Sequence, residues 1–328
     1  MLTLNIVLLA TLHEPDFFMR GHLDALSDAD SDAIAQHYVA LVEKYQTELT
    51  AQKQEVARYI KVARDLTTNL ATDQSWRNVA RLKKMRCVGQ IGQIEAAMLY
   101  ILLREYRPKR TIEIGALCGS STRWMLAALE ANGLGQLITY DLHGYTPAFI
   151  GAAVPNLLHR WKFIQGDAIA ALGNETARFD ADALFIDALH RNSFAQIYTE
   201  RLLGKAAAQA TKPLPVFVHD IFTPFMMPRF RPCQLNMSFV TLVDEVACMK
   251  RVLRQERGLD VHYSEKQPAG EGVELMSWLA RTARSKGLTT FSMYANPRVA
   301  WAIARAMGRP NTAAANNPSI FFQLIPDH

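Results

Sequence analysis

Short apolar runs alternate with segments of helical periodicity between residues 111 and 219, and this alternation restricts the possible folds more than any other feature. The apolar runs lie at 111–115, 136–140, 161–165, 183–187 and 215–219. Strands that alternate with helices are typical of a parallel sheet whose crossover helices cover both faces. The runs are apolar at nearly every position, as expected for strands buried on both faces. The sequence therefore predicts an α/β protein with a doubly wound sheet.

Helical segments separate most of these runs and also precede them. The separating segments lie at 120–131, 193–209 and 238–256. Residues 31–70 carry apolar side chains at helical spacing without any Pro or Gly, which predicts one or two amphipathic helices. Another helix is expected over 90–106, and Pro108 follows it as a stop signal.

We divide the chain into three regions on this basis. Residues 1–75 form a helical extension that is expected to cover the cleft or to form a dimer contact. Residues 76–265 form the ligand-binding core, with a further strand at 259–264. Residues 266–328 form a C-terminal extension with helices and a short last strand at 272–278.

The composition excludes several classes of protein. Hydrophobic residues make up 49% and charged residues 20% of the 328 residues, as in soluble globular proteins. The net charge of +5 is too small an excess to predict a nucleic-acid partner. The apolar N-terminus lacks the features of a signal peptide and is too short to span a bilayer. The four cysteines form no CxxC pair and no zinc-site spacing, which favours reduced thiols in a cytoplasmic protein.

A glycine-containing loop, EIGALCGSS, follows the first apolar run and leads directly into a helix. Gly115 and Gly119 let the backbone turn tightly and let a ligand approach the helix N-terminus. The spacing differs from that of dinucleotide-binding enzymes, and no Gly-Lys-Ser/Thr follows as in a P-loop. Taken alone, the loop is also compatible with a plain turn between a strand and a helix.

The next strands end on acidic residues. The second run ends at Asp141, which is placed to accept hydrogen bonds from ribose hydroxyls. The third ends in QGDA, where the Asp167 carboxylate could meet an adenine amino group, and the fourth ends at Asp187. The carboxyl ends of parallel strands lie at one edge of an open α/β sheet, where ligands bind. The pattern therefore predicts a ligand crevice at this edge.

As an ordered set, these motifs resemble the class I S-adenosylmethionine-dependent methyltransferases, over about residues 85–265. Residues 89–122 are similar to the entry segment of the catechol and caffeoyl-CoA O-methyltransferases. The segment DALFIDALHRNSF resembles a bacterial group that includes metal-dependent sugar O-methyltransferases. The resemblance implies a Rossmann-like fold in which Asp141 holds the ribose of S-adenosylmethionine and Asp167 with Ala168 holds the adenine end. It implies cofactor contacts at Glu113, Gly115, Ala116, Gly119, Ser121, Asp141, Asp167, Ala168 and Asp187.

Asp187 and Asp220 end two successive strands that a single helix connects. Neighbouring strands lie about 4.8 Å apart, so the two carboxylates would repel each other unless a cation lay between them. Mg²⁺ would satisfy both and would lower the pKa of a bound substrate oxygen. The catechol-type enzymes follow their second aspartate with asparagine, whereas Ile221 stands here, so a third ligand is unassigned and His219 is a weak candidate. Alternatively, Asp187 caps the following helix or orients the cofactor amine.

His190 lies three residues beyond Asp187, and its pKa range suits a general base that deprotonates a hydroxyl. The catechol-type enzymes carry a lysine at the matching place, and the sugar O-methyltransferases carry a histidine. A surface histidine without a catalytic role is the alternative. The resemblance therefore favours an alcohol or sugar hydroxyl as the methyl acceptor.

These inferences together predict a methyltransferase that acts on a small-molecule hydroxyl, such as a sugar or a secondary metabolite, and that forms a homodimer. One alternative is a metal-free N- or O-methyltransferase acting on a peptide or another metabolite. The motif NPPY or DPPY is a signature of N-methyltransferases, and it does not follow the fourth strand here. Its absence disfavours the methylation of amino groups and bases by that kind of enzyme. The other alternative is a non-catalytic, methyltransferase-like binding subunit, which the intact ligand edge disfavours.

Overall fold

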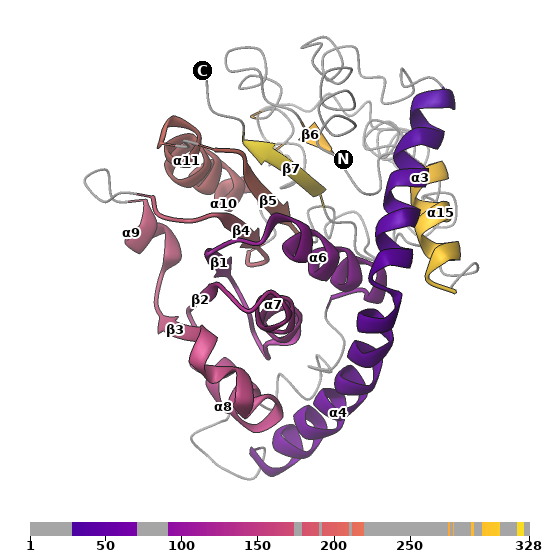
Figure 1. Cartoon of the computed structure of the whole chain (residues 1–328). Helices are drawn as coiled ribbons and strands as arrows, with labels where there is room; N and C mark the ends of the chain where they lie inside the picture. The colour runs from indigo at the N-terminus through magenta and orange to yellow at the C-terminus, as the bar shows by residue number, and fades with distance from the viewer. Residues whose placement is uncertain are drawn as a thin grey trace, which may run out of the picture. The chain divides into compact units, whose positions relative to one another are not determined.

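The computed structural model describes residues 28–70, 91–173, 179–189, 192–209, 212–219, 275, 278, 290–291, 297–308 and 320–324. They belong to two compact units. Figure 1 labels the helices and strands of both units. One unit, here called the loop unit because it contains the glycine loop, comprises Leu41–Ala171 and Asp180–Ala188. The other comprises Met1–Ala40, Leu172–Phe179 and Leu189–His328.

Four parallel strands form the centre of the loop unit, in the order β3-β2-β1-β4. They are β1 (Arg110–Ile114), β2 (Gln136–Asp141), β3 (Trp161–Gln165) and β4 (Ala183–Ile186). Each lies within one residue of the predicted apolar run at both ends. The register places Glu113 of β1 level with Thr139 of β2 and with Phe185 of β4. All carboxyl ends therefore meet at one edge, as predicted for the ligand crevice.

The helices of the loop unit lie before and between these strands in sequence. They are α4 (Gln46–Leu70), α6 (Gln93–Tyr106), α7 (Ser120–Ala131), α8 (Thr146–Ala153), the 3-10 helix η3 (Pro155–Arg160) and α9 (Ala168–Leu172). In α6 every residue from Ile94 to Leu103 is buried, as expected for a helix that is apolar on all sides. Arg107 ends α6 in a left-handed conformation, directly before Pro108. The predicted strand–helix alternation is confirmed in this unit, and the Rossmann-like α/β class with it.

The second unit contains an antiparallel group of strands in the order β5-β7-β6. These strands are β5 (Leu214–Val218), β6 (Thr290–Phe291) and β7 (Ile320–Leu324). Its helices include α10 (Asn192–Ile197), the π-helix η4 (Tyr198–Leu203), α11 (Gly204–Gln209) and α15 (Pro297–Ala306). The helix predicted over 193–209 is thus confirmed as three consecutive helical pieces.

The prediction of a last strand at 272–278 is wrong at the two residues that the structure describes there. Leu275 and Trp278 are helical and buried, and their spacing of three residues fits one face of a helix as well as a strand core. The predicted helix over 238–256 and the predicted strand at 259–264 lie outside the described residues. No described helix has the length and apolar character needed to cross a membrane.

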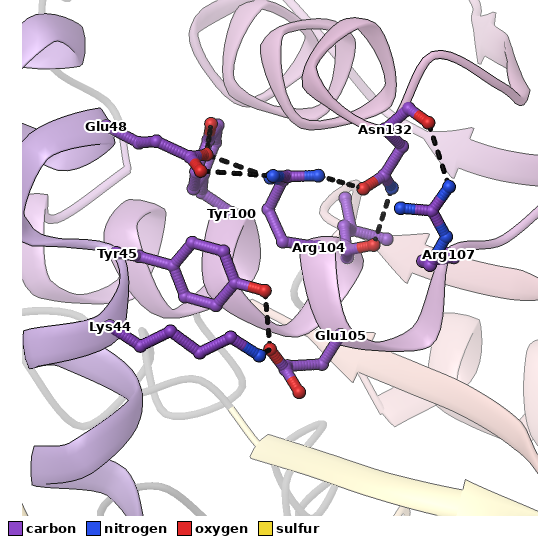
Figure 2. Close-up of polar contacts among 9 residues, drawn as sticks. Lys44, Tyr45, Glu48, Tyr100, Arg104, Glu105, Arg107 and Asn132 are labelled. Atoms are coloured by element: carbon purple, nitrogen blue, oxygen red, sulfur yellow. Dashed lines mark hydrogen bonds and ion pairs between the residues drawn. The ribbon is translucent and has the colours of Figure 1, made fainter.

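The predicted amphipathic helices over 31–70 are confirmed as α3 (Asp28–Lys44) and α4, and a cluster of polar side chains ties α4 to α6 (Figure 2). Glu48 of α4 accepts hydrogen bonds from Arg104 at 2.9 and 3.0 Å and from the Tyr100 hydroxyl. Arg104 also donates to Asn132, which follows α7. The hydrogen bond from Arg104 lowers the pKa of Glu48, as expected for a charge-assisted pair. Half of the predicted N-terminal extension therefore packs as part of the loop unit.

Candidate functional site

The glycine loop begins at Gly115, where the chain leaves β1 and passes between the ends of two neighbouring strands. The Gly115 amide donates to the Tyr140 carbonyl at 2.8 Å, and its φ is +80°. A Cβ atom at this position would lie 1.9 Å from the Asp187 carbonyl oxygen. Only glycine fits such a conformation and such a close backbone approach.

The rest of the loop contains two more left-handed residues. Gly119 has φ +86°, and a Cβ atom there would lie 2.7 Å from the Ile150 side chain. Leu117 has φ +47°, which for a residue with a side chain costs about 1–2 kcal/mol. Such strain persists only where surrounding contacts fix the backbone, and it is common at ligand-binding segments.

Asp141 holds the backbone of this loop from the end of β2. Its Oδ2 atom accepts hydrogen bonds from the amides of Ala116 and Leu117, both at 2.9 Å. Its Oδ1 atom accepts one from the amide of His143 at 2.8 Å. A carboxylate offers about four acceptor positions, so these three bonds leave capacity for a further donor. The predicted contact with ribose hydroxyls stays a prediction, and the structure adds a loop-fixing role.

Glu113 lies beneath the loop and is fully buried. Its carboxylate accepts hydrogen bonds from the hydroxyls of Ser121 at 2.6 Å and of Thr122 and Thr139 at 2.7 Å. Burial raises the pKa of Glu113 to about 7, against the opposing effect of the three hydroxyls, and the nearby charge of Asp187 raises it further. Glu113 therefore fixes the first turn of α7 to β1 and β2. The predicted cofactor contacts of Glu113 and Ser121 stay predictions.

The substitution Glu113→Gln should change how stability depends on pH. The folded-state pKa of about 7 lies above the ordinary value of 4.5, so the contribution of Glu113 is fully present below about pH 4.5 and is lost as pH rises through about 7. Across this interval the wild type should lose about 3 kcal/mol of unfolding free energy relative to the variant. Urea unfolding of both proteins at several pH values measures this difference. A difference that does not vary with pH would contradict it.

Asp167 follows β3 and caps the short helix α9. Its Oδ1 atom accepts hydrogen bonds from the amides of Ile169 at 2.8 Å and Ala170 at 3.2 Å, which is typical of a helix N-cap. The Ala168 side chain is buried. The Gly166 amide donates to the Asp141 carbonyl at 2.9 Å, so the ends of β2 and β3 lie together. The predicted adenine contacts of Asp167 and Ala168 remain predictions.

Leu142 was not among the predicted site residues, yet it lies at this edge. It directly follows Asp141, and 67% of its surface is exposed. An exposed apolar side chain beside a strand-end carboxylate offers a flat ligand both an apolar contact and an acceptor. Its place immediately after Asp141 was the sequence signal that could have identified it.

Asp187 follows β4 and faces the same edge of the loop unit. Its amide donates to the Ile114 carbonyl at 2.8 Å, and its charge lies near enough to Glu113 to affect the pKa of that carboxyl. The structure thus places the backbone of Asp187 beside the start of the glycine loop, and its predicted roles stay predictions. Cys118, within the loop, is buried.

Residues 112–221 match the model of a protein family described as a methyltransferase domain. The chain contains a methyltransferase domain. The match begins in β1, includes the glycine loop, and continues beyond β5. The prediction of a methyltransferase from the ordered strand-end motifs is therefore confirmed.

Solved structures of several methyltransferases are similar to the chain. One is an O-methyltransferase from Streptomyces achromogenes involved in tomaymycin synthesis, in complex with SAM, with 12% identity, 80% of this chain and 96% of that chain covered, and a TM-score of 0.45. Another is an O-methyltransferase from Bacillus cereus in complex with SAH, with 12% identity, coverage of 80% and 97%, and a TM-score of 0.42. A third is an SAH-bound methyltransferase from Podospora anserina, with 13% identity, coverage of 82% and 86%, and a TM-score of 0.41. No curated protein matches the chain significantly.

The predicted catalytic and metal-binding partners of Asp187 also belong to the methyltransferase domain in sequence. His190 and Asp220 lie within the matched range but outside the described residues. His219, which the sequence offered as a weak third ligand, is buried. Among the described residues, no group of three or more His, Cys, Asp or Glu side chains could hold a metal ion. The metal site predicted from Asp187 and Asp220 therefore stays a prediction.

Proposed function

We propose that this chain is an S-adenosylmethionine-dependent O-methyltransferase that acts on a hydroxyl group of a small molecule, such as a sugar or a secondary metabolite. The observation that carries the proposal is the edge of the loop unit, where Asp141 fixes a strained glycine loop inside a methyltransferase domain. The histidine at position 190 supports oxygen as the acceptor atom, since a neutral imidazole can take the proton of a hydroxyl at physiological pH.

Two features of the edge fit S-adenosylmethionine. The spare acceptor capacity of Asp141 suits the paired hydroxyls of a ribose. The exposed side chain of Leu142 suits the apolar face of a purine. Asp167 and Ala168 would hold the adenine end, and Asp187 would lie beside the methionine part. Bound there, S-adenosylmethionine supplies a methyl group whose bond to sulfur breaks as a bond to the acceptor oxygen forms.

His190 is proposed as the general base, and Asp187 as the neighbouring carboxylate that helps to orient the reacting groups. Asp187 stands at the end of β4 beside the glycine loop, and His190 follows it three positions later in sequence. His190 would take the hydroxyl proton, which leaves an oxygen nucleophile for the methyl group. Alignment of the reacting groups by the rigid strand ends would supply much of the acceleration.

A divalent cation such as Mg²⁺, held by Asp187 and Asp220, is a further part of the proposal. Its support is the sequence, in which both aspartates end strands of the methyltransferase domain. The metal would bind the acceptor oxygen and lower its pKa. Chelation of the purified protein before the assay tests this part, and full activity afterwards would leave the cofactor assignment standing without a metal.

A homodimer and a cytoplasmic location are also proposed. Light scattering would measure the oligomeric state.

The substitution Asp141→Asn tests the function most directly. It keeps the size of the side chain and removes the charge that would accept from a ribose. A hydrogen bond to a charged group contributes about 1.5–3 kcal/mol, so the Kd for S-adenosylmethionine should rise roughly ten- to hundredfold. Isothermal titration calorimetry measures the change. A Kd within about twofold of the wild-type value would correspond to far less than the energy of a hydrogen bond to a charged group. That result would refute the ribose assignment.

Asp182→Asn is the matched control for this variant. The Asp182 Oδ2 atom also accepts two backbone amides, those of Lys109 at 2.8 Å and Arg110 at 3.1 Å, but at the opposite end of β1. It should therefore lose comparable stability and keep its cofactor affinity. A wild-type protein that binds neither S-adenosylmethionine nor S-adenosylhomocysteine would instead favour the non-catalytic binding subunit.

A further inference from the structure

The N-terminal helix α4 reaches the glycine loop through one side chain. The Tyr59 hydroxyl donates to the carbonyl oxygen of Cys118 at 2.5 Å. Tyr59 is only 2% exposed, and Cys118 is fully buried. Burial also raises the pKa of Tyr59, so the phenol remains a protonated donor at physiological pH. The two residues lie 59 positions apart in sequence, and the bond therefore joins the predicted extension to the predicted cofactor loop.

The segment around Leu117 is held from three separate elements. Asp141 of β2 accepts the amides of Ala116 and Leu117. The Thr146 hydroxyl, from the first turn of α8, donates to the Leu117 carbonyl at 2.9 Å. Tyr59 of α4 fixes the next carbonyl, that of Cys118. Because Leu117 occupies a left-handed conformation, these bonds oppose its relaxation to an ordinary one.

The position of Tyr59 is itself fixed by contacts along α4. Gln52 accepts a hydrogen bond at 2.9 Å from Arg123 of α7. Arg58 donates to the Ala153 carbonyl at the end of α8 at 3.1 Å, and α4 packs against α8. Further along the helix, Glu48 pairs with Arg104 of α6 (Figure 2). The Tyr59 hydroxyl is thus held in place before any ligand arrives.

We propose that Tyr59 is a positioning residue for cofactor binding, which holds the 116–118 backbone in its ligand-ready conformation through the Cys118 carbonyl. This inference rests on the proposed function, because it takes S-adenosylmethionine as the ligand of the loop. It makes α4 a part of the cofactor site, in addition to the cover or dimer contact expected from the sequence. A preorganised loop lowers the ordering cost of binding, so the role should appear in cofactor affinity.

Tyr59→Phe is the decisive variant, and Tyr45→Phe is its matched control. The Tyr45 hydroxyl also donates from this N-terminal helical region, but to Glu105 of α6 rather than to the loop. A neutral hydrogen bond corresponds to roughly a two- to tenfold change in an equilibrium constant. We expect Tyr59→Phe to raise the calorimetric Kd for S-adenosylhomocysteine, and the KM for S-adenosylmethionine, by about that factor with kcat nearly unchanged. Tyr45→Phe should lower the melting temperature about as much as Tyr59→Phe does. It should leave both the Kd and the KM unchanged.

Hydrogen exchange of the 116–119 amides in the ligand-free protein gives a second readout. Exchange should be faster in Tyr59→Phe than in Tyr45→Phe, because only the first variant releases the loop. Thr146→Val, which removes the neighbouring donor from α8, should weaken binding in the same way and serves if Tyr59→Phe does not fold. Two results would overturn the inference: an unchanged Kd and unchanged exchange in Tyr59→Phe, or an equal loss of cofactor affinity in both tyrosine variants. If the wild type still binds the cofactor, the proposed function stands in either case. A wild type without any binding would overturn both.

Discussion

Gly115→Ala should destabilise the protein by about 2–5 kcal/mol and should abolish measurable cofactor binding. Two separate effects contribute. The residue has φ +80°, a left-handed conformation that costs a side-chain-bearing residue about 1–2 kcal/mol. The new Cβ would also lie 1.9 Å from the Asp187 carbonyl oxygen and 3.1 Å from the Ala188 Cα atom. Both are backbone atoms, so the end of β4 must move away from β1, and that edge carries the proposed cofactor site.

Gly133→Ala is a control that separates these two effects. Gly133 has φ +67°, but a Cβ atom there would meet nothing within 4 Å. The Gly133→Ala variant should therefore lose only the conformational part of the unfolding free energy, about 1–2 kcal/mol. It should bind S-adenosylhomocysteine as the wild type does. Urea unfolding with a fixed m-value compares the three proteins. Equal losses in the two glycine variants would show that β4 accommodates the methyl group and that the close approach does not matter.

The central strands were predictable from sequence because β1, β2 and β4 are largely buried on both faces. Each of β1 to β4 contains a short, mainly apolar run that ends within a residue of the strand, although the residues of β3 are only partly buried or exposed. The antiparallel strands of the other unit were less visible. β7, the run IFFQL at 320–324, pairs with β5 although about a hundred residues separate them in sequence, and no local pattern specifies such a partner. Leu275 and Trp278 were assigned to a strand because a short apolar run does not distinguish the two periodicities.

The positions of the site residues followed from the strand ends, whereas their bonding partners did not. Glu113 could be placed in the motif, but its hydrogen bond from Thr139 depends on the register of β1 with β2. The sequence also gave no sign that Asp141 accepts hydrogen bonds from loop amides, because these bonds depend on the left-handed conformation of Leu117. The apolar spacing over 31–70 predicted amphipathic helices, and Tyr59 lies within this stretch. It gave no indication that the hydroxyl meets the Cys118 carbonyl, because that contact exists only once α4 has packed on the loop unit.

His190→Ala should lower kcat by about 10²–10⁴-fold, the usual contribution of general acid–base catalysis. The variant should bind S-adenosylmethionine as tightly as the wild type, because the proposed cofactor contacts lie on Gly115, Asp141 and their neighbours. A base must be neutral to accept a proton, so the wild-type rate should rise with pH through the pKa of the histidine, near 6.5 when unperturbed. The variant should lose this rise. A panel of sugars and phenols, assayed with labelled S-adenosylmethionine, would first identify an acceptor.

Single-turnover rates from about pH 5.5 to about pH 9 then decide the role of His190. His159→Ala is the matched control, because His159 is an exposed histidine on η3 that pairs with Glu130. It should keep both the rate and the pH dependence of the wild type. A metal-bound substrate oxygen could lose its proton without a histidine, so the same series is run before and after chelation. A His190→Ala rate within about fivefold of the wild type falls short of the expected range, and would move the base to Asp187 or to the metal-bound oxygen according to the effect of chelation.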